Sequence, residues 1–96
     1  MSILFYDFMY RMLISYDLIS PGTDYDELYE YLQSFPQSKH PLESVWVVKT
    51  DKKQDAIRDE LKKIVDTNDK VLIVDITGCG SAWHNIPAEN WIKNGQ

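Results

Sequence analysis

The chain has three histidine and cysteine side chains, which could bind zinc, at spacings that match no recognised zinc motif. They are His40, Cys79 and His84. A structural zinc ion normally takes four nitrogen or sulfur ligands. We instead expect His40, which precedes Pro41, to face solvent in a turn, and Cys79, which lies between two glycines, to be a small residue in a bend. These residues therefore predict no zinc site.

Two further patterns suggest nucleotide or nucleic-acid binding, and each has a structural explanation. Residues 78–81, GCGS, follow a predicted strand as a phosphate-binding loop does, but they lack the lysine and the long helix of such loops. Tryptophan rings can stack on unpaired bases. In a small dimeric protein they more often anchor the core or the subunit interface. We expect that role for Trp46, Trp83 and Trp91.

The charge distribution argues against general affinity for nucleic acids. The formal net charge is −5, and residues 1–48 carry seven acidic and two basic side chains, whereas residues 49–96 carry eight of each. An acidic chain lacks the long-range positive field that attracts phosphate backbones. The lysines that follow position 51 are mixed with acidic residues, which is typical of a solvated helix face. A local basic patch is still compatible with this composition.

The first half of the chain predicts a strand and a helix. Residues 12–18, MLISYDL, form a compact apolar run with β-branched and aromatic members, and the turn signal SPG at 20–22 ends it. A helix is then predicted over 24–34, with Thr23 as its N-cap and acidic residues in its first turn. Pro36 ends this helix because proline cannot continue it.

The second half predicts two strands, a second helix and a final strand. Residues 44–50, SVWVVKT, give the clearest strand pattern, and residues 36–42 form a short strand that its prolines confine to a sheet edge. The second helix is expected to start near Asp51, with Gln54 completing its cap. Residues 71–76 form a continuous apolar strand of the buried type. The apolar face of the second helix comprises Ile57, Leu61, Ile64 and Val65.

The resulting order is β-α-β-β-α-β, which is that of an α+β ferredoxin-like sandwich. Two helices on one face of a four-stranded antiparallel sheet bury the apolar faces of all six elements in the simplest way. We place this core at residues 12–77 of the 96-residue chain, with an apolar N-terminal extension at 1–11 and a C-terminal extension at 78–96. A chain of this size buries only about 60–65% of its unfolded surface, so an oligomer interface would add burial.

Both extensions are expected to be ordered. The apolar content of residues 1–11 predicts that Phe5 and Phe8 are substantially buried. In the C-terminal extension, Pro87 is placed to begin a short helix over 87–92. This extension has no evident place on one subunit. Together with the small core, it leads us to expect a homodimer.

The composition also predicts a location in the cytoplasm and no membrane association. Cys79 is the only cysteine, so the disulfides that support small secreted domains are excluded. Residues 3–10 are apolar but contain Asp7 and follow no basic stretch, unlike a signal peptide. No run approaches the roughly 20 apolar residues that span a bilayer.

The motifs at the ends of the predicted strands resemble those of a known group of small proteins. Tyr16-Asp17 closes the first strand and residues 43–46, ESVW, open the third, as in the small CRISPR adaptation protein that pairs with the integrase. A closer similarity, over residues 12–94, is to the SinR-like small proteins, and VapD-type ribonuclease toxins share the architecture. The SinR-like pattern also includes Asn68-Asp69, Thr77-Gly78 and the residues WIKN at 91–94.

This resemblance implies a dimer with its sheets side by side and a C-terminal strand that crosses to the partner. It further implies a nuclease acting on RNA or DNA, with Asp17 and Ser44 as catalytic residues and Tyr16 nearby. Asp17 would bind Mg²⁺ or Mn²⁺ together with its symmetry mate, because hard oxygen ligands suit these ions. The chain departs from the adaptation proteins at Leu42, where they carry glutamine. It also departs after Asp17, where their basic residues are replaced by Pro21, Gly22 and Asp24.

The residues alone leave a second class of function open. Asp17 could simply order the turn after its strand, and the protein would then be a non-catalytic interaction module. In that case the acidic first half would dock a basic protein partner, and an acidic mimic of DNA is a more remote alternative. Metal-dependent nuclease and interaction module are therefore the two hypotheses that the sequence supports.

Overall fold

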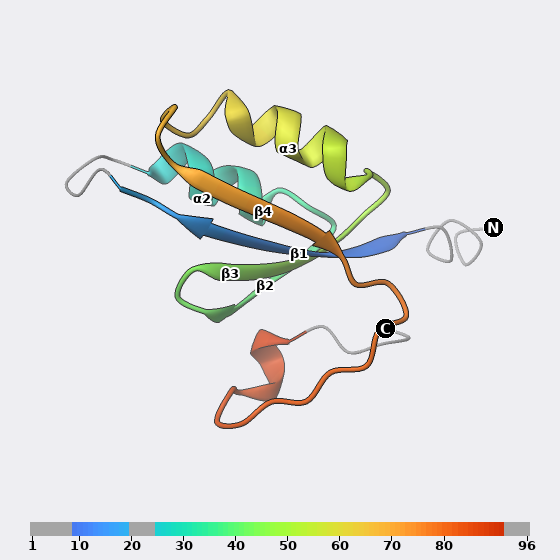
Figure 1. The fold of residues 1–96 in the computed structure, drawn as a ribbon. Coiled ribbons are helices and arrows are strands. Elements are labelled where there is room, and N and C mark those ends of the chain that lie inside the picture. Colours follow the sequence, from blue (N-terminus) through green and yellow to red (C-terminus); the bar gives the residue numbers. More distant parts are fainter. Residues whose placement is uncertain (1–8, 20–24, 92–96) are drawn as a thin grey trace.

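A four-stranded antiparallel sheet with two helices on one face forms most of the structure, a computed structural model that describes residues 9–19 and 25–91 (Figure 1). The strand order β2-β3-β1-β4, with all neighbours antiparallel, confirms the expected ferredoxin-like α+β fold. The elements are β1 (Tyr10–Asp17), α2 (Asp26–Gln33), β2 (Gln37–Leu42), β3 (Val45–Thr50), α3 (Gln54–Lys62), β4 (Lys70–Asp75) and the 3₁₀ helix η1 (Ala88–Asn90).

The core lies between the sheet and the two helices. Strand side chains alternate between the two faces of a sheet, so Met12, Ile14 and Tyr16 of β1 all face the helices. Leu28 and Leu32 of α2 pack against them. The other buried members of this cluster are Phe35, Trp46, Val48, Ile57 and Leu61. The helix-facing side chains of the central strands and the apolar faces of both helices therefore form one apolar layer.

The helix starts differ from the expected ones. Helix α3 begins at Gln54, not near Asp51, and no side chain caps its N-terminus. The hydroxyl Oγ1 of Thr50 accepts a hydrogen bond from the backbone N–H of Lys52 at 3.0 Å. This local turn keeps the preceding residues out of the helix. The predicted cap Thr23 lies outside the described residues, as do Phe5 and Phe8.

Strand β2 occupies one edge of the sheet, as its prolines predict. Pro41 lies within β2, and the pairing with β3 is irregular between Lys39 and Leu42. A proline is tolerated there because an edge strand has one row of backbone donors without a ladder partner. His40 is exposed as expected, but it lies in this strand and not in a turn.

Strand β4 occupies the other edge, and its prediction as a buried strand was wrong. Its side chains alternate, with Leu72 and Val74 59% and 40% exposed while Val71 and Ile73 face the core. An apolar run cannot distinguish a strand covered on both faces from an edge strand covered on one. The helices of this fold cover only one face, so alternate residues of the run remain exposed.

Residues 78–91, the C-terminal strap, run along the sheet face opposite the helices (Figure 1). The turn into the strap is closed by the N–H of Cys79, which donates to the carbonyl of Ile76 at 3.0 Å, and Gly78 supplies the positive φ of 76°. The strap ends in η1, preceded by Pro87 as expected, and η1 contacts β2. The described part of this extension therefore has a place on its own subunit, contrary to our expectation.

Candidate functional site

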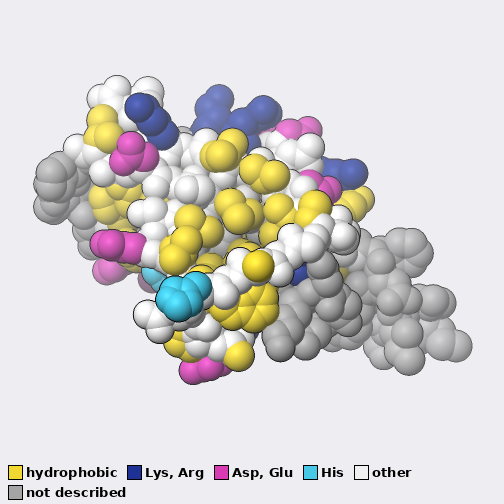
Figure 2. Space-filling model, turned by 60° about the horizontal axis from the view of Figure 1, so that its bottom comes forward, with side chains coloured by type: hydrophobic (Ala, Val, Ile, Leu, Met, Phe, Trp, Pro, Cys, Tyr) yellow, Lys and Arg dark blue, Asp and Glu magenta, His cyan; other side chains and the backbone are white. Residues whose placement is uncertain are grey.

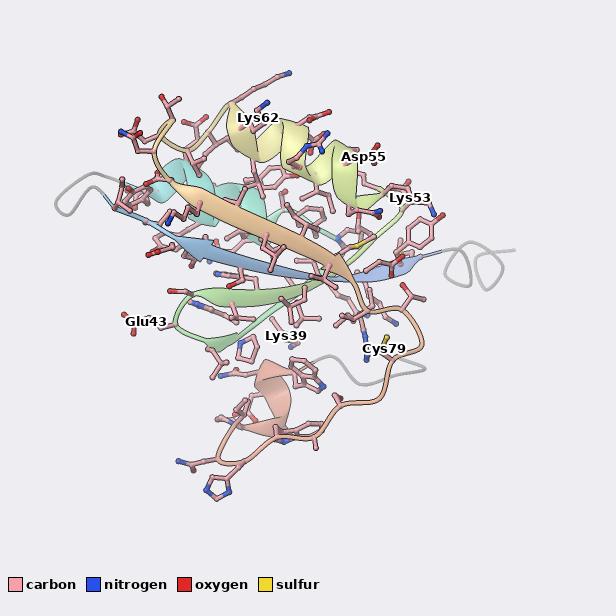
Figure 3. All side chains as sticks on the ribbon, viewed as in Figure 1. Lys39, Glu43, Lys53, Asp55, Lys62 and Cys79 are labelled. Carbon is pink, nitrogen blue, oxygen red and sulfur yellow. The ribbon has the colours of Figure 1, made fainter. Side chains whose placement is uncertain are left out.

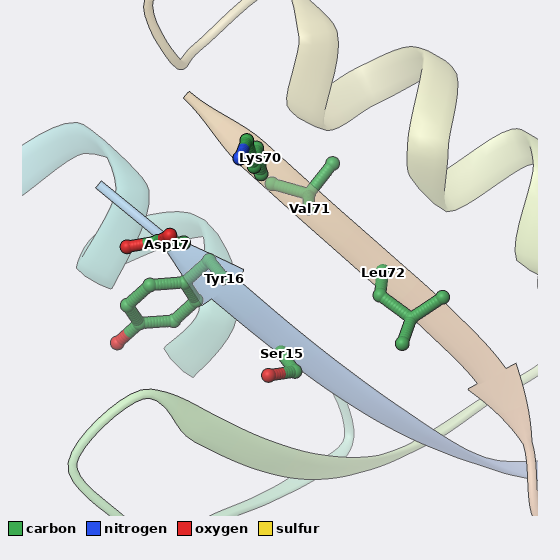
Figure 4. Close-up of a pocket in the computed structure, with 6 residues that line it drawn as sticks. All are labelled: Ser15, Tyr16, Asp17, Lys70, Val71 and Leu72. Atoms are coloured by element: carbon green, nitrogen blue, oxygen red, sulfur yellow. The ribbon is translucent and has the colours of Figure 1, made fainter. Parts of the chain in front are cut away.

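Asp17 lies at the exposed end of β1, on the sheet face away from the helices. Its direct neighbour across the ladder is Lys70, the first residue of β4. Both line an open hollow of about 170 Å³, together with Ser15, Tyr16, Val71 and Leu72 (Figure 4). The positive charge of Lys70 opposes the binding of a metal cation beside Asp17, whereas it favours the binding of an anion such as a phosphate.

Ser44 is held at the same end of the sheet. Its carbonyl accepts a hydrogen bond from the backbone N–H of Tyr16 at 3.1 Å, and Ser44 itself is exposed. The sheet thus brings Tyr16, Asp17 and Ser44 to one end, as the resemblance implies. Within residues 9–19 and 25–91, however, no group of three histidine, cysteine or carboxylate side chains is placed to hold a metal ion. Of the residues that the resemblance assigns to this site, Asp17 is the only carboxylate.

The phenol of Tyr16 is used to order this end of the sheet. Its oxygen accepts a hydrogen bond from Trp46 Nε1 at 3.1 Å and donates to the carbonyl of Glu43 at 3.4 Å. Burial raises the pKa of Tyr16, so the phenol stays protonated near neutral pH. The ring of His40 stacks on Trp46 with centroids 4.2 Å apart. We interpret this group as a packed structural cluster and not as a general base.

Asp69 is a second carboxylate near Asp17 along the β1–β4 end, and its role was missed from the sequence. It accepts hydrogen bonds from the N–H of Ile19 at 3.0 Å and from the N–H of Asp66 at 2.9 Å. The Tyr25 hydroxyl lies 3.3 Å from both carboxylate oxygens. Asp69 therefore ties the segment after β1 to the loop before β4. The Asn-Asp pair gave only a turn signal, because the donors Ile19 and Tyr25 lie 50 and 44 positions away in the sequence.

Arg11 anchors the strap under the sheet. Its Nη2 donates to the carbonyl of Cys79 at 2.8 Å, and its backbone N–H donates to Thr77 Oγ1 at 2.9 Å. Arg11 is only 4% exposed although it faces away from the helices. Within the strap, Trp91 Nε1 donates to Ser81 Oγ at 3.1 Å, and the rings of Trp83 and Trp91 are 6.0 Å apart.

The strap leaves an apolar part of the sheet uncovered. Val47 on β3 is fully buried, whereas Leu72 and Val74 on β4 are well exposed. The ladder places Leu13 opposite Val74 and Ser15 opposite Leu72. We call these four residues of β1 and β4, namely Leu13, Ser15, Leu72 and Val74, the open face. Figure 2 shows hydrophobic side chains gathered over this side of the molecule, with lysine and arginine side chains at its upper rim.

A tyrosine–glutamate–lysine group links the two helices on the other side of the sheet. Tyr31 of α2 donates a hydrogen bond to Glu60 Oε1 of α3 at 2.6 Å, and Lys52 Nζ donates to both carboxylate oxygens at 2.9 Å. Burial and the hydrogen bond to Glu60 raise the pKa of Tyr31 well above its ordinary value. The bonds from Tyr31 and Lys52 lower the pKa of Glu60.

These tyrosines predict a loss of stability at alkaline pH. The unfolded chain ionises its tyrosines at about pH 10, whereas folding holds Tyr16 and Tyr31 protonated to higher pH. Their contribution is complete below about pH 10 and is lost as the pH rises toward the folded pKa values. Urea unfolding from about pH 8 to about pH 11 should show this decline. The variant Tyr31→Phe should decline less, and equal slopes for the two proteins would contradict the assignment.

Comparison with known proteins identifies no relative. No protein-family model matches the chain, and neither a curated protein nor a solved structure matches it. Among the described residues, no helix is long and apolar enough to cross a membrane.

Proposed function

We propose that this protein is a cytoplasmic homodimeric interaction module that uses its open face to contact a second copy. The observation that carries the proposal is the 59% and 40% exposure of Leu72 and Val74 on an edge strand. Burial of apolar surface contributes about 25 cal/mol per Å². A contact across a two-fold axis covers this patch on both copies at once.

The position of the open face supports the proposal that a second copy covers it, and that it does not stay exposed to solvent in a monomer. Small domains bury a low fraction of their surface, and contiguous apolar patches usually mark interaction sites. Leu72 and Val74 neighbour Ser15 and Leu13 across the ladder, so the patch is continuous and almost free of charge. Asp17 and Lys70 lie at one end of it and can set the register of two copies.

Two matched leucine variants test this proposal. Leu72→Glu should raise the dissociation constant of the dimer at least about tenfold, because it places a charge in an apolar contact. Leu42→Glu, at the opposite edge of the sheet where Leu42 is 55% exposed, should leave the dimer unchanged. Sedimentation equilibrium measures both constants. Equal effects of the two substitutions would rule out the open face as the dimer contact.

The acidic helix α2 supports a basic protein as the further partner of this module. Asp26, Glu27 and Glu30 are its charged residues, and it carries no basic side chain. Complementary charge accelerates association with a basic surface. If the protein instead acts as an acidic mimic of DNA, it would use the same helix. This alternative stays a prediction from the sequence.

A metal-dependent nuclease is the second candidate function, and the exposed position of Asp17 favours it. A two-fold axis near Ser15 and Leu72 would bring two Asp17 carboxylates toward each other, with Ser44 at the same end of each sheet. Such a dimer would supply two Asp17 carboxylates to one Mg²⁺ or Mn²⁺ ion, whereas no group of three possible ligands comes together in the part of one copy that the structure describes. The likeness of residues 16–17 and 43–46 to the CRISPR adaptation proteins supports this candidate. The SinR-like and VapD-type resemblances point the same way.

A further inference from the structure

The strap and the open face divide between them the sheet face that lies away from the helices. Trp46 and Val48 of β3 belong to the core, so Val47 between them faces away from the helices, yet it is fully buried. The described segment on that side is the strap, which lies below β2 and β3 in Figure 1, and its helix η1 contacts β2. The strap therefore covers the β2–β3 half of this face, and the open face is the β1–β4 half.

The strap carries little charge. Its residues 78–91 contain one acidic and no basic side chain. In Figure 3, Cys79 lies at the start of the strap, whereas the labelled charged residues of α3, Asp55 and Lys62, lie on the helix side of the sheet. Trp83, near the middle of the strap, is 39% exposed. The strap is thus a second surface of low charge, with an exposed aromatic ring, on the same side of the molecule as the open face.

The open face alone is too small for a stable dimer contact. Its two strands are together about 10 Å wide, and the six residues of β4 extend for about 20 Å. Their footprint is roughly 200 Å² on each copy, whereas a specific interface usually buries about 800 Å² on each partner. A stable contact therefore has to include more surface than the open face itself.

We propose that the strap of the second copy covers the open face, and that this contact is reciprocal. The inference rests on the proposed homodimer and names the part of the partner that covers its contact surface. A two-fold axis parallel to the strands reverses the strand order β2-β3-β1-β4 in the second copy, which places each strap against β1 and β4 of the other. The two straps, each still on its own sheet, then form one layer between the two sheets.

This arrangement covers more apolar surface than direct contact between two open faces. It covers Leu72, Val74 and Trp83 on both copies, and these are three of the five exposed large hydrophobic side chains among the described residues. Tryptophan is enriched among the residues that dominate the binding energy of interfaces. Low charge on both surfaces also avoids burying an unpaired charge between the copies. Direct contact between open faces would join only two strands of each copy.

Photo-crosslinking from the strap distinguishes the two arrangements. Trp83 is replaced by benzoylphenylalanine, which keeps a large aromatic side chain, and isotope-labelled and unlabelled chains are mixed so that links between copies are identified by mass. Cleavage before aspartate separates residues 69–74, which include most of β4, from residues 75–96. We expect position 83 of one copy to link to residues 69–74 or 7–16 of the other. Links between copies only at other fragments, or no links between copies, would overturn the proposal.

Dimer dissociation constants from sedimentation equilibrium separate failure of this inference from failure of the proposed function. Trp83→Ala should raise the constant at least about tenfold, and Trp83→Phe should raise it less. Leu42→Ala, at the opposite sheet edge, is the control and should leave it unchanged. If Leu72→Glu weakens the dimer and Trp83→Ala does not, the dimer uses the open face without the strap, and this inference alone is wrong. If neither substitution weakens the dimer, the proposed function is wrong as well.

Discussion

Ile14→Ala should lower the free energy of unfolding by about 2–5 kcal/mol. Ile14 is fully buried at the centre of β1, where its ladder partners are Trp46 and Ile73. Truncation removes apolar contacts and leaves a cavity that neighbouring strands on both sides prevent from closing. Such a change is a large part of the roughly 5–15 kcal/mol that stabilises a domain. Urea denaturation followed by tryptophan fluorescence measures it.

Leu42→Ala is the control for this core prediction. Leu42 is 55% exposed at the edge of the sheet, so its truncation should change the free energy of unfolding by no more than about 0.5 kcal/mol. If the two substitutions destabilise the protein equally, β1 is not the centre of the core. The assignment of the helix-facing residues would then have to be revised.

Asp17→Asn should separate the two proposed functions. If two Asp17 carboxylates hold a catalytic metal, Mg²⁺-stimulated cleavage of RNA or DNA should fall by about two or more orders of magnitude. Asparagine keeps the shape of the side chain but not its charge. If Asp17 only orders the end of β1, the substitution should cost about 1 kcal/mol of stability or less. A nuclease assay in the presence of Mg²⁺, Mn²⁺ or EDTA, with unfolding in urea, gives both readouts.

Ser44→Ala is the companion variant for this assay. Ser44 uses its backbone carbonyl to bind Tyr16, so loss of the hydroxyl should leave the fold intact. A fall in cleavage would then support a catalytic role for the hydroxyl. Cleavage by wild-type protein that neither EDTA nor Asp17→Asn reduces would contradict the nuclease candidate as stated.

The sequence predicted the fold because its local patterns agree with the tertiary arrangement. The apolar run at 12–18 and the clear strand pattern at 44–50 became the two central strands, β1 and β3. Leu28 and Leu32 repeat at helical spacing and are buried together. Pro41 marked the edge position of β2. These features depend on neighbours in sequence, which periodicity and proline chemistry report directly.

The features missed from the sequence depend on contacts between distant residues. The hydrogen bond from Arg11 to the carbonyl of Cys79, which anchors the strap, joins residues 68 positions apart. Asp69 accepts a hydrogen bond from the N–H of Ile19, which is 50 positions away. Leu72 is exposed because the helices cover only the other face of β4. The continuous apolar run at 71–76 could not show which face that would be. The end of the sheet that gathers Tyr16, Asp17 and Ser44 was predicted through resemblance, but Lys70 opposite Asp17 was not.

The mass of the protein in solution is the most direct test of the interaction module. Light scattering across micromolar concentrations should give about twice the chain mass of 11.2 kDa, because the open face needs a second copy to be covered. The same measurement on Leu72→Glu should shift toward one chain mass. A wild-type mass of 11.2 kDa that stays constant at all of these concentrations would contradict the account.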